Sequence, residues 1–250
     1  MNRGTPALKR FSDGIASLVI FGIQLAQDLK ERPDERRSDV GRDVFSLRLG
    51  AFAPVLHGMI LTRGVDDFLI YLSELFGLIF RTEPGTLRSG EKIAIEEVLQ
   101  HESLDEVVAY LANRRAERLA YAGLRAIAAE LENDLGFELF QENDLDRAVQ
   151  VVGARNLVVH NRGVINAMYL RRVPDGGVLE ERLPIDGAFV LGSLDFLAAA
   201  SRGIDGRAVA KFILPTDDFS PLPPDVQTVL ADKQWPSEHR ELQDFERSGD

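Results

Sequence analysis

The sequence predicts an all-α fold, a multi-helix bundle built from long apolar helices. Over most of the 250 residues, apolar side chains recur at the three- and four-residue spacing of one helix face. Signals typical of strands are confined to one short piece between residues 173 and 187. Hydrophobic residues make up 45% of the chain and charged residues 28%, which is typical of a globular protein with a sizeable core.

The first two helices are the longest expected. Apolar positions at helical spacing run from Thr5 to Glu31, where a charged stretch ends them. A second apolar segment from Asp39 to about Phe80 predicts either one helix bent near Pro54 or two helices in series. The proline and glycines of residues 81–92 then predict a loop.

Shorter helices should follow. Residues 93–100, "IAIEEVLQ", predict the first of them. The letters "SLDE" form a capping box in which Ser103 is the N-cap and Glu106 the third helical residue, so a helix should run from there to about Asn133. Residues 133–144 are an acidic connection to the next helix.

The hydrophobic pattern after residue 143 sets the expected domain boundary. A helix over 144–161, with Asn143 available to cap it, should end near Asn161 to Gly163. Residues 173–187 predict a small irregular or hairpin insertion. Apolar content returns from Ala188 to about Leu214, interrupted by "SRGIDGR". We therefore expect one helical domain over 1–214. The acidic, proline-rich segment 215–250 is expected to be a loosely ordered or peripheral tail.

The residues that several classes of chemistry require are absent from the sequence. The chain has no cysteine, which excludes disulfides and thiolate chemistry, and its four histidines are scattered without metal-ligand spacing. No phosphate-binding loop, dinucleotide fingerprint or nucleophile elbow occurs, so we expect no metal and no cofactor. The uncharged run Gly14–Gln27 is too short to cross a bilayer. We expect a cytoplasmic protein without membrane contact.

Charge is distributed unevenly. The net charge is −11, which alone argues against a nucleic-acid partner. Residues 147–174, however, contain five arginines and no acid. The rest of the chain keeps only 24 of the 29 basic residues against all 40 acids. This basic segment predicts a local anion site, with Arg162, Arg171 and Arg172 as candidate phosphate contacts beside Asn161.

The same segment contains the stretch "RNLVVHNRGVIN", residues 155–166. Arg155 offers a planar, permanently charged fork for phosphate, and His160 can move a proton near neutral pH. Asn156, four residues before His160, shares its helix face and could orient either group. A purely structural alternative stays open, because cations at a helix C-terminus also complement the helix dipole.

On these residues the chain resembles the higher eukaryotes and prokaryotes nucleotide-binding (HEPN) superfamily. Its signature is an arginine, usually a polar residue, and a histidine four to six positions after the arginine, here Arg155, Asn156 and His160. The continuation through Asn166 and Tyr169 is similar to the branch with large helical insertions found among bacterial defence and toxin proteins. The order of helices from about Asp39 to Tyr169 is similar too.

The resemblance implies a helical bundle that dimerises through the motif helix, so that two motifs share one cleft. Active members are metal-independent endoribonucleases that leave cyclic phosphate and 5′-hydroxyl ends. By residue, His160 would be the general acid/base, Arg155 the contact to the scissile phosphate and Asn156 the orienting group. The implied partners are an RNA substrate and an antitoxin or defence-system protein.

Two other functions stay open at this point. The chain could be a catalytically silent HEPN-like scaffold or regulatory subunit, or it could bind nucleotides without cleaving them. A silent subunit predicts Arg155 and His160 buried in structural hydrogen bonds. A ribonuclease predicts both side chains in a cleft open to solvent.

Overall fold

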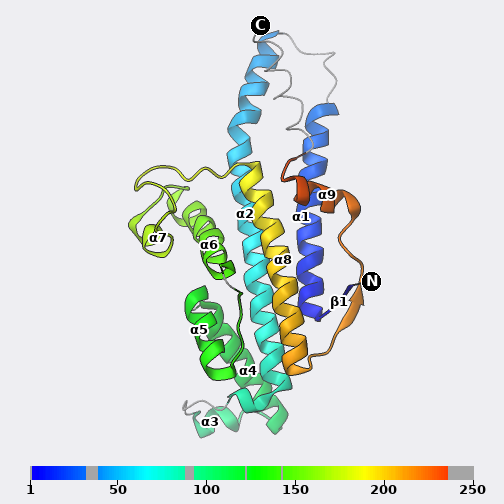
Figure 1. Ribbon diagram of the computed structural model, residues 1–250, viewed down its shortest axis with the longest axis vertical. Coiled ribbons are helices and arrows are strands. Elements are labelled where there is room, and N and C mark those ends of the chain that lie inside the picture. The colour runs from blue at the N-terminus through cyan, green and yellow to red at the C-terminus, as the bar shows by residue number, and fades with distance from the viewer. Residues whose placement is uncertain (1, 32–38, 88–92, 122, 142, 236–250) are drawn as a thin grey trace. The chain divides into compact units, whose positions relative to one another are not determined.

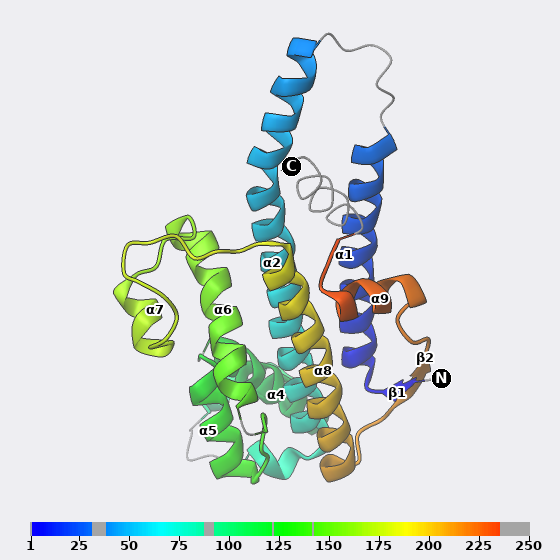
Figure 2. The ribbon, with the colours of Figure 1, turned by 45° about the horizontal axis from the view of Figure 1, so that its top comes forward.

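The all-α prediction is confirmed in the computed structural model, which describes residues 2–31, 39–87, 93–121, 123–141 and 143–235 (Figures 1 and 2). Its elements, in chain order, are β1 (Asn2–Gly4), α1 (Pro6–Glu31), α2 (Asp39–Thr82), the 3-10 helix η2 (Pro84–Leu87), α3 (Ile95–Val98), α4 (Leu104–Tyr121), α5 (Leu124–Leu135), α6 (Asp144–Asn161), α7 (Ala167–Arg172), α8 (Gly187–Phe212), β2 (Asp217–Phe219) and α9 (Pro224–Asp232). The segment between α7 and α8 is irregular, as expected, with one isolated bridge from Val164 to Arg182.

The chain forms two compact units that interleave along the sequence. Unit 1 consists of Met1–Phe11, Asp67–Val149 and Ala199–Pro221, and unit 2 of Ser12–Asp66, Gln150–Ala198 and Leu222–Asp250. Helices α1, α2, α6 and α8 each contribute residues to both units. The boundary expected after residue 214 falls inside unit 1.

An aromatic cluster occupies the core of unit 1. Phe11 from α1 lies 5.6 Å from the ring of Tyr71 and 6.1 Å from that of Phe68, and Phe68 also contacts Phe140. All four side chains are buried. Burying a ring of this size stabilises the fold by roughly 1.5–3 kcal/mol, so these contacts anchor the start of α1 to the second half of α2.

The start of α1 is held by hydrogen bonds as well. Thr5 caps the helix, because its Oγ1 accepts from the N–H of Leu8 at 3.2 Å. Asp205 of α8 accepts from the Thr5 N–H at 3.0 Å and from the Thr5 hydroxyl at 2.5 Å, and both residues are buried. The sequence pattern did not predict the antiparallel pair β1–β2, which joins Asn2–Gly4 to Asp217–Phe219 in the same unit.

The helix expected from Ser103 to Asn133 is in fact two helices. Its start is as predicted: the Ser103 hydroxyl accepts from the Glu106 N–H at 3.2 Å, and the Glu106 carboxylate accepts from the Glu102 N–H at 2.8 Å. The first helix, α4, ends at Tyr121, and Gly123 precedes α5 with a non-helical ψ of 149°. Glycine is a weak helix former, and here it marks the break.

Two long segments are more continuous than their sequences suggest. Helix α2 runs through Pro54 as one helix of 44 residues. Helix α8 runs through "SRGIDGR", because buried Ile204, Asp205 and Ala208 hold that stretch in the core. Among the described helices, α8 alone is long and apolar enough to cross a membrane, but 67% of its most apolar window is buried inside the protein. A core helix meets the same criteria.

Part of the segment expected to be a peripheral tail is folded. Helix α9 buries Val226, Val229 and Leu230, which are spaced for one helix face. Within unit 2, the ring of Trp235 packs directly against Gly22 of α1, and this tryptophan is only 5% exposed. Residues 236–250 of the expected tail lie outside the described residues.

Candidate functional site

The three motif residues lie on the C-terminal part of α6, inside unit 2. Arg155 is 22% exposed and forms an ion pair from its Nη2 to Oδ1 of Asp66 on α2 at 2.7 Å. Its Nη1 donates to Oδ1 of Asn156 at 3.0 Å. Asn156 therefore orients Arg155 in this structure, and two side chains fix the direction of the guanidinium.

His160 has a different environment. It is exposed and lies in the last turn of α6. It lies five positions after Arg155, about 140° around the helix at ~100° per residue. The arginine is thus turned toward α2 and the histidine toward solvent, so within one chain the structure does not bring them together in a closed site.

The end of α6 is built by backbone in the left-handed region. Arg162 has φ +53° and Gly163 has φ +77°, and the Gly163 N–H donates to the carbonyl of Leu157 at 2.9 Å. Glycine suits this conformation, whereas an arginine there is uncommon. The Asn161 amide donates to the carbonyl of Val164 at 2.6 Å. Asn161, expected as a phosphate contact, uses this group to close the turn.

The chain after the motif returns along the end of α6. The Ile165 N–H donates to the Glu181 carbonyl at 2.8 Å, and the Leu183 N–H donates to the Gly163 carbonyl at 2.9 Å. Between these two bonds, Val164 and Arg182 form the antiparallel bridge. Arg182, distant in sequence from the motif, is thereby fixed beside the end of the motif helix.

Tyr169 locks this returning chain onto α6. Asn166 caps α7 by accepting from the Tyr169 N–H at 2.9 Å, and the tyrosine is 4% exposed beside Leu157 and Ile165. A Cβ on Gly153 would lie 2.9 Å from two of its ring carbons, so only glycine leaves room for the ring. Burial raises the pKa of Tyr169, and its hydroxyl has no hydrogen-bond partner among the described residues.

We predict that Tyr169→Phe stabilises the protein by about 1 kcal/mol. A buried hydroxyl without a partner carries a desolvation cost that phenylalanine removes, while the ring packing is kept. Tyr71→Phe is the matched control, because the Tyr71 hydroxyl donates to the carbonyl of Ser201 at 3.0 Å. It should lose about 1 kcal/mol. Denaturant midpoints measure both, and a loss of stability in Tyr169→Phe would show that the Tyr169 hydroxyl does have a hydrogen-bond partner.

A groove of about 930 Å³ lies next to the motif in unit 2. Its walls come from α2, from the end of α6 and from the returning segment around Arg182. Most of the lining is apolar, and the polar side chains in it include Asp66 and Arg162. The members of its lining are Ala53, Pro54, Val55, His57, Gly58, Met59, Thr62, Arg63, Asp66, Val158, Arg162, Gly163, Arg182, Leu183, Pro184, Ile185 and Asp186.

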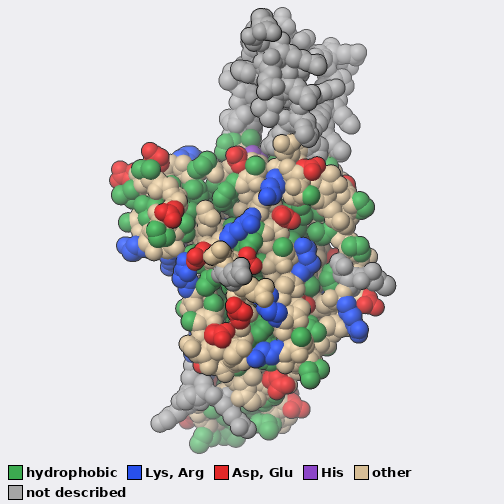
Figure 3. All heavy atoms as spheres, in the orientation of Figure 1, with side chains coloured by type: hydrophobic (Ala, Val, Ile, Leu, Met, Phe, Trp, Pro, Cys, Tyr) green, Lys and Arg blue, Asp and Glu red, His purple; other side chains and the backbone are tan. Residues whose placement is uncertain are grey.

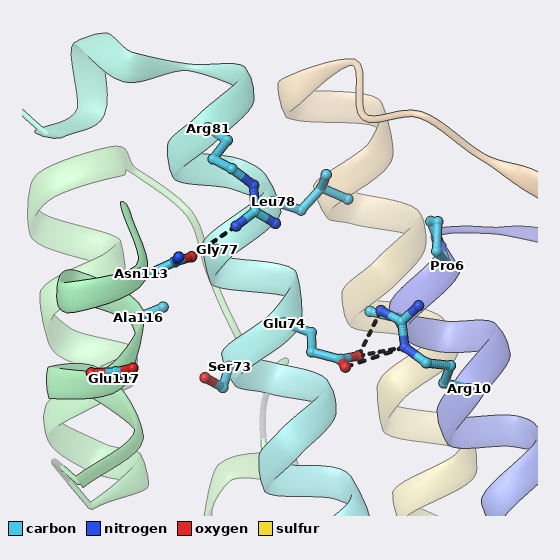
Figure 4. A pocket seen from close by; sticks show the side chains of 11 residues that line it. Pro6, Arg10, Ser73, Glu74, Gly77, Leu78, Arg81, Asn113, Ala116 and Glu117 are labelled. Carbon is cyan, nitrogen blue, oxygen red and sulfur yellow. Dashed lines mark hydrogen bonds and ion pairs between the residues drawn. The ribbon is translucent and has the colours of Figure 1, made fainter. Parts of the chain in front are cut away.

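A second cavity, of about 430 Å³, lies in unit 1 between α1, α2 and α4 (Figure 4). Its arginines already hold partners. Arg10 binds the Glu74 carboxylate through Nε at 3.1 Å and Nη2 at 2.9 Å, and Arg81 donates to Oδ1 of Asn113 at 2.9 Å. Because its cations are engaged in this way, the cavity is a weaker candidate than the groove.

The other two arginines predicted to contact phosphate lie on the surface outside the groove. Arg171 and Arg172 are exposed in the last turn of α7 and do not line the groove. On the face shown in Figure 3, basic side chains are interspersed with acidic ones. Two residues of the site carry no signal in the sequence: Asp66 stands in no motif that would mark it, and neither does Arg182.

Within the described residues, no three His, Asp or Glu side chains come together as metal ligands would. Comparison of the chain with protein-family models, with curated proteins and with solved structures finds no match.

Proposed function

We propose that this protein is a metal-independent endoribonuclease of the HEPN type, acting as a homodimer in a cytoplasmic toxin–antitoxin or phage-defence setting. The observation that carries the proposal is that the end of one helix presents both an oriented Arg155 and, on another side, a solvent-exposed His160. Together they supply a phosphate contact and a proton carrier, which are the groups that RNA cleavage without a metal requires.

The reaction is an internal transfer. The ribose 2′-oxygen attacks the adjacent phosphorus while His160 takes its proton, and the bond from phosphorus to the 5′-oxygen breaks. The protonated His160 of the second chain in the dimer gives a proton to that 5′-oxygen. The products are a 2′,3′-cyclic phosphate and a 5′-hydroxyl. Arg155 stabilises the additional negative charge on the phosphoryl oxygens in the transition state.

The need for both a base and an acid is the reason for a dimer. Each chain offers one histidine in the motif, and a twofold axis would bring two of them to one phosphate. Two exposed apolar side chains support such a contact: Val159, the residue before His160, is 47% exposed, and Met168 of α7 is 55% exposed. Large apolar side chains at a surface favour association.

Asp66 and Asn156 position the side chain of Arg155. It holds one edge of the Arg155 guanidinium, and Asn156 holds another. The Arg155 Nε–H is buried and has no hydrogen-bond partner among the described residues. A guanidinium held on two sides keeps its remaining N–H groups in a fixed direction, as recognition of a phosphate requires.

The direct test is cleavage of a labelled, mixed RNA pool by the purified protein in EDTA. We expect cutting without added metal, with cyclic phosphate on the 5′ fragment and a hydroxyl on the 3′ fragment. Size-exclusion chromatography with light scattering should give the mass of two chains. A monomeric protein that leaves RNA intact in EDTA would overturn the proposal.

A catalytically silent HEPN-like dimeric subunit is the second candidate. It is favoured by the Arg155–Asp66 ion pair, which occupies part of the proposed phosphate contact, and by the net charge of −11. Such a subunit would bind an antitoxin or another defence-system protein, or a nucleotide, without cutting RNA. Intact RNA together with a stable dimer in the same assay would support this second function.

A further inference from the structure

We infer that the groove on the Arg155 side of the motif helix binds single-stranded RNA. An unpaired base would lie in its apolar part, and the flanking phosphates would bind Arg162 and Arg182. This inference rests on the proposed function. It adds a substrate-binding subsite to it, built largely from residues outside the Arg155–His160 motif.

The apolar part of the groove suits a nucleobase. Val55 and Met59 of α2 are 59% and 64% exposed, although both are apolar side chains of a long helix. Val158 of α6 and Ile185 of the returning segment add further apolar surface. The faces of a base are apolar and its edges polar, so an unstacked base can cover such side chains and keep its edges in water. A base stacked within a duplex cannot enter.

Charge at the groove favours an anionic ligand. Its two carboxylates are engaged: Asp66 pairs with Arg155 at 2.7 Å, and Asp186 accepts from the Phe189 N–H at 2.8 Å, where α8 begins. Arg162 and Arg182 are both exposed, and the structure records no ion pair for either among its described residues. Two guanidinium groups are thus available at the rim, and phosphate is the anion that repeats along a nucleic-acid strand.

The positions of these two arginines are set by backbone. Arg162 directly follows α6 in the left-handed region, and the bridge from Val164 holds Arg182 beside Gly163. Binding therefore orders only side chains and not the chain that presents them, which lowers the entropic cost of association. An acidic peptide would also meet the charge. Nucleic acid fits better, because the apolar and cationic parts adjoin as base and phosphate do in one nucleotide.

The test uses binding without cleavage. In a His160→Ala background, fluorescence anisotropy measures the affinity for a labelled 12-nucleotide single-stranded RNA and its dependence on salt. We expect Arg182→Gln to weaken binding about tenfold and to reduce the magnitude of the salt slope by about 0.7, which corresponds to one lost phosphate contact. The control is Arg202→Gln, an exposed arginine in unit 1, which should leave both quantities unchanged.

Further arms separate the alternatives. Met59→Asp should weaken binding of the single strand by a similar factor, and a duplex of the same sequence should bind more weakly than the single strand. Equal affinity of Arg182→Gln and its parent would overturn the groove assignment, even if the wild type cleaves RNA. The groove assignment would also be overturned if single-stranded RNA did not bind the parent protein at low salt. If Arg182→Gln loses binding and the wild type never cleaves RNA, the groove assignment would stand and the proposed ribonuclease activity would be refuted.

Discussion

Replacing His160 with alanine should lower metal-independent RNA cleavage by about a hundredfold to ten-thousandfold, the usual contribution of a general acid or base. The side chain is exposed on the last turn of α6, so its removal creates no cavity and leaves no buried group without a partner. The loss should therefore appear in the rate and not in the thermal midpoint. Single-turnover cleavage in EDTA measures it.

The matched control is His101→Ala, the same change at a histidine of unit 1 whose ring lies 5.0 Å from that of Tyr110. It should cleave as the wild type does. Equal loss in both variants would point to a general effect of removing a histidine, and unchanged cleavage in His160→Ala would remove this residue from the mechanism. Either result would contradict the proposed chemistry.

The largest expected effect on stability comes from Asp205. Asp205→Ala should destabilise the protein by about 3 kcal/mol, because it leaves both the N–H and the hydroxyl of Thr5 buried without an acceptor. Each such group costs about 1–3 kcal/mol. The start of α1 and the pairing of β1 with β2 depend on this contact. Chemical denaturation followed by circular dichroism is the measurement.

Asp205→Asn is the control, because its amide can still accept from the Thr5 N–H and donate to the Thr5 oxygen. This variant also tests how the negative charge of Asp205 affects stability. Burial raises the pKa of Asp205, partly offset by the hydrogen bonds from Thr5. The native state therefore holds this proton more tightly than the unfolded state. The contribution of Asp205 is complete below the ordinary aspartate pKa and is lost as pH rises through the raised value.

The wild type should therefore lose stability relative to Asp205→Asn as pH increases across that range. A stability difference that is constant with pH would contradict the assignment of the raised pKa to this carboxyl. An asparagine variant as unstable as the alanine variant would show instead that the negative charge itself is required at this position.

Local signals accounted for the helices that begin or end with a recognisable residue. The capping box at Ser103 forms as its spacing predicts, and α6 ends where the chain reaches Arg162 and Gly163. These features could be predicted because their hydrogen bonds join residues only a few positions apart. The periodicity of α1 could be read in the same way, since one face of it is buried.

Features made by distant residues could not be predicted. Asp205 binds a residue 200 positions away, and the two strands meet across a similar separation. The two additions to the site are of this kind. Asp66 reaches Arg155 from another helix, and Arg182 arrives through backbone hydrogen bonds of a segment without regular structure. By contrast, the folded part of the segment after 214 did carry a signal, the spacing of Val226, Val229 and Leu230, which its acidic composition obscured.

The packing of Trp235 against Gly22 makes intrinsic fluorescence a local probe. The chain contains one tryptophan, and that residue is buried in unit 2. Its emission will shift to longer wavelength when water reaches the ring, whereas circular dichroism follows the helices of both units. The two transitions coincide only if the units unfold together. Because Thr5 and Asp205 belong to unit 1, comparing the two signals in Asp205→Ala would measure how cooperatively the interleaved units unfold.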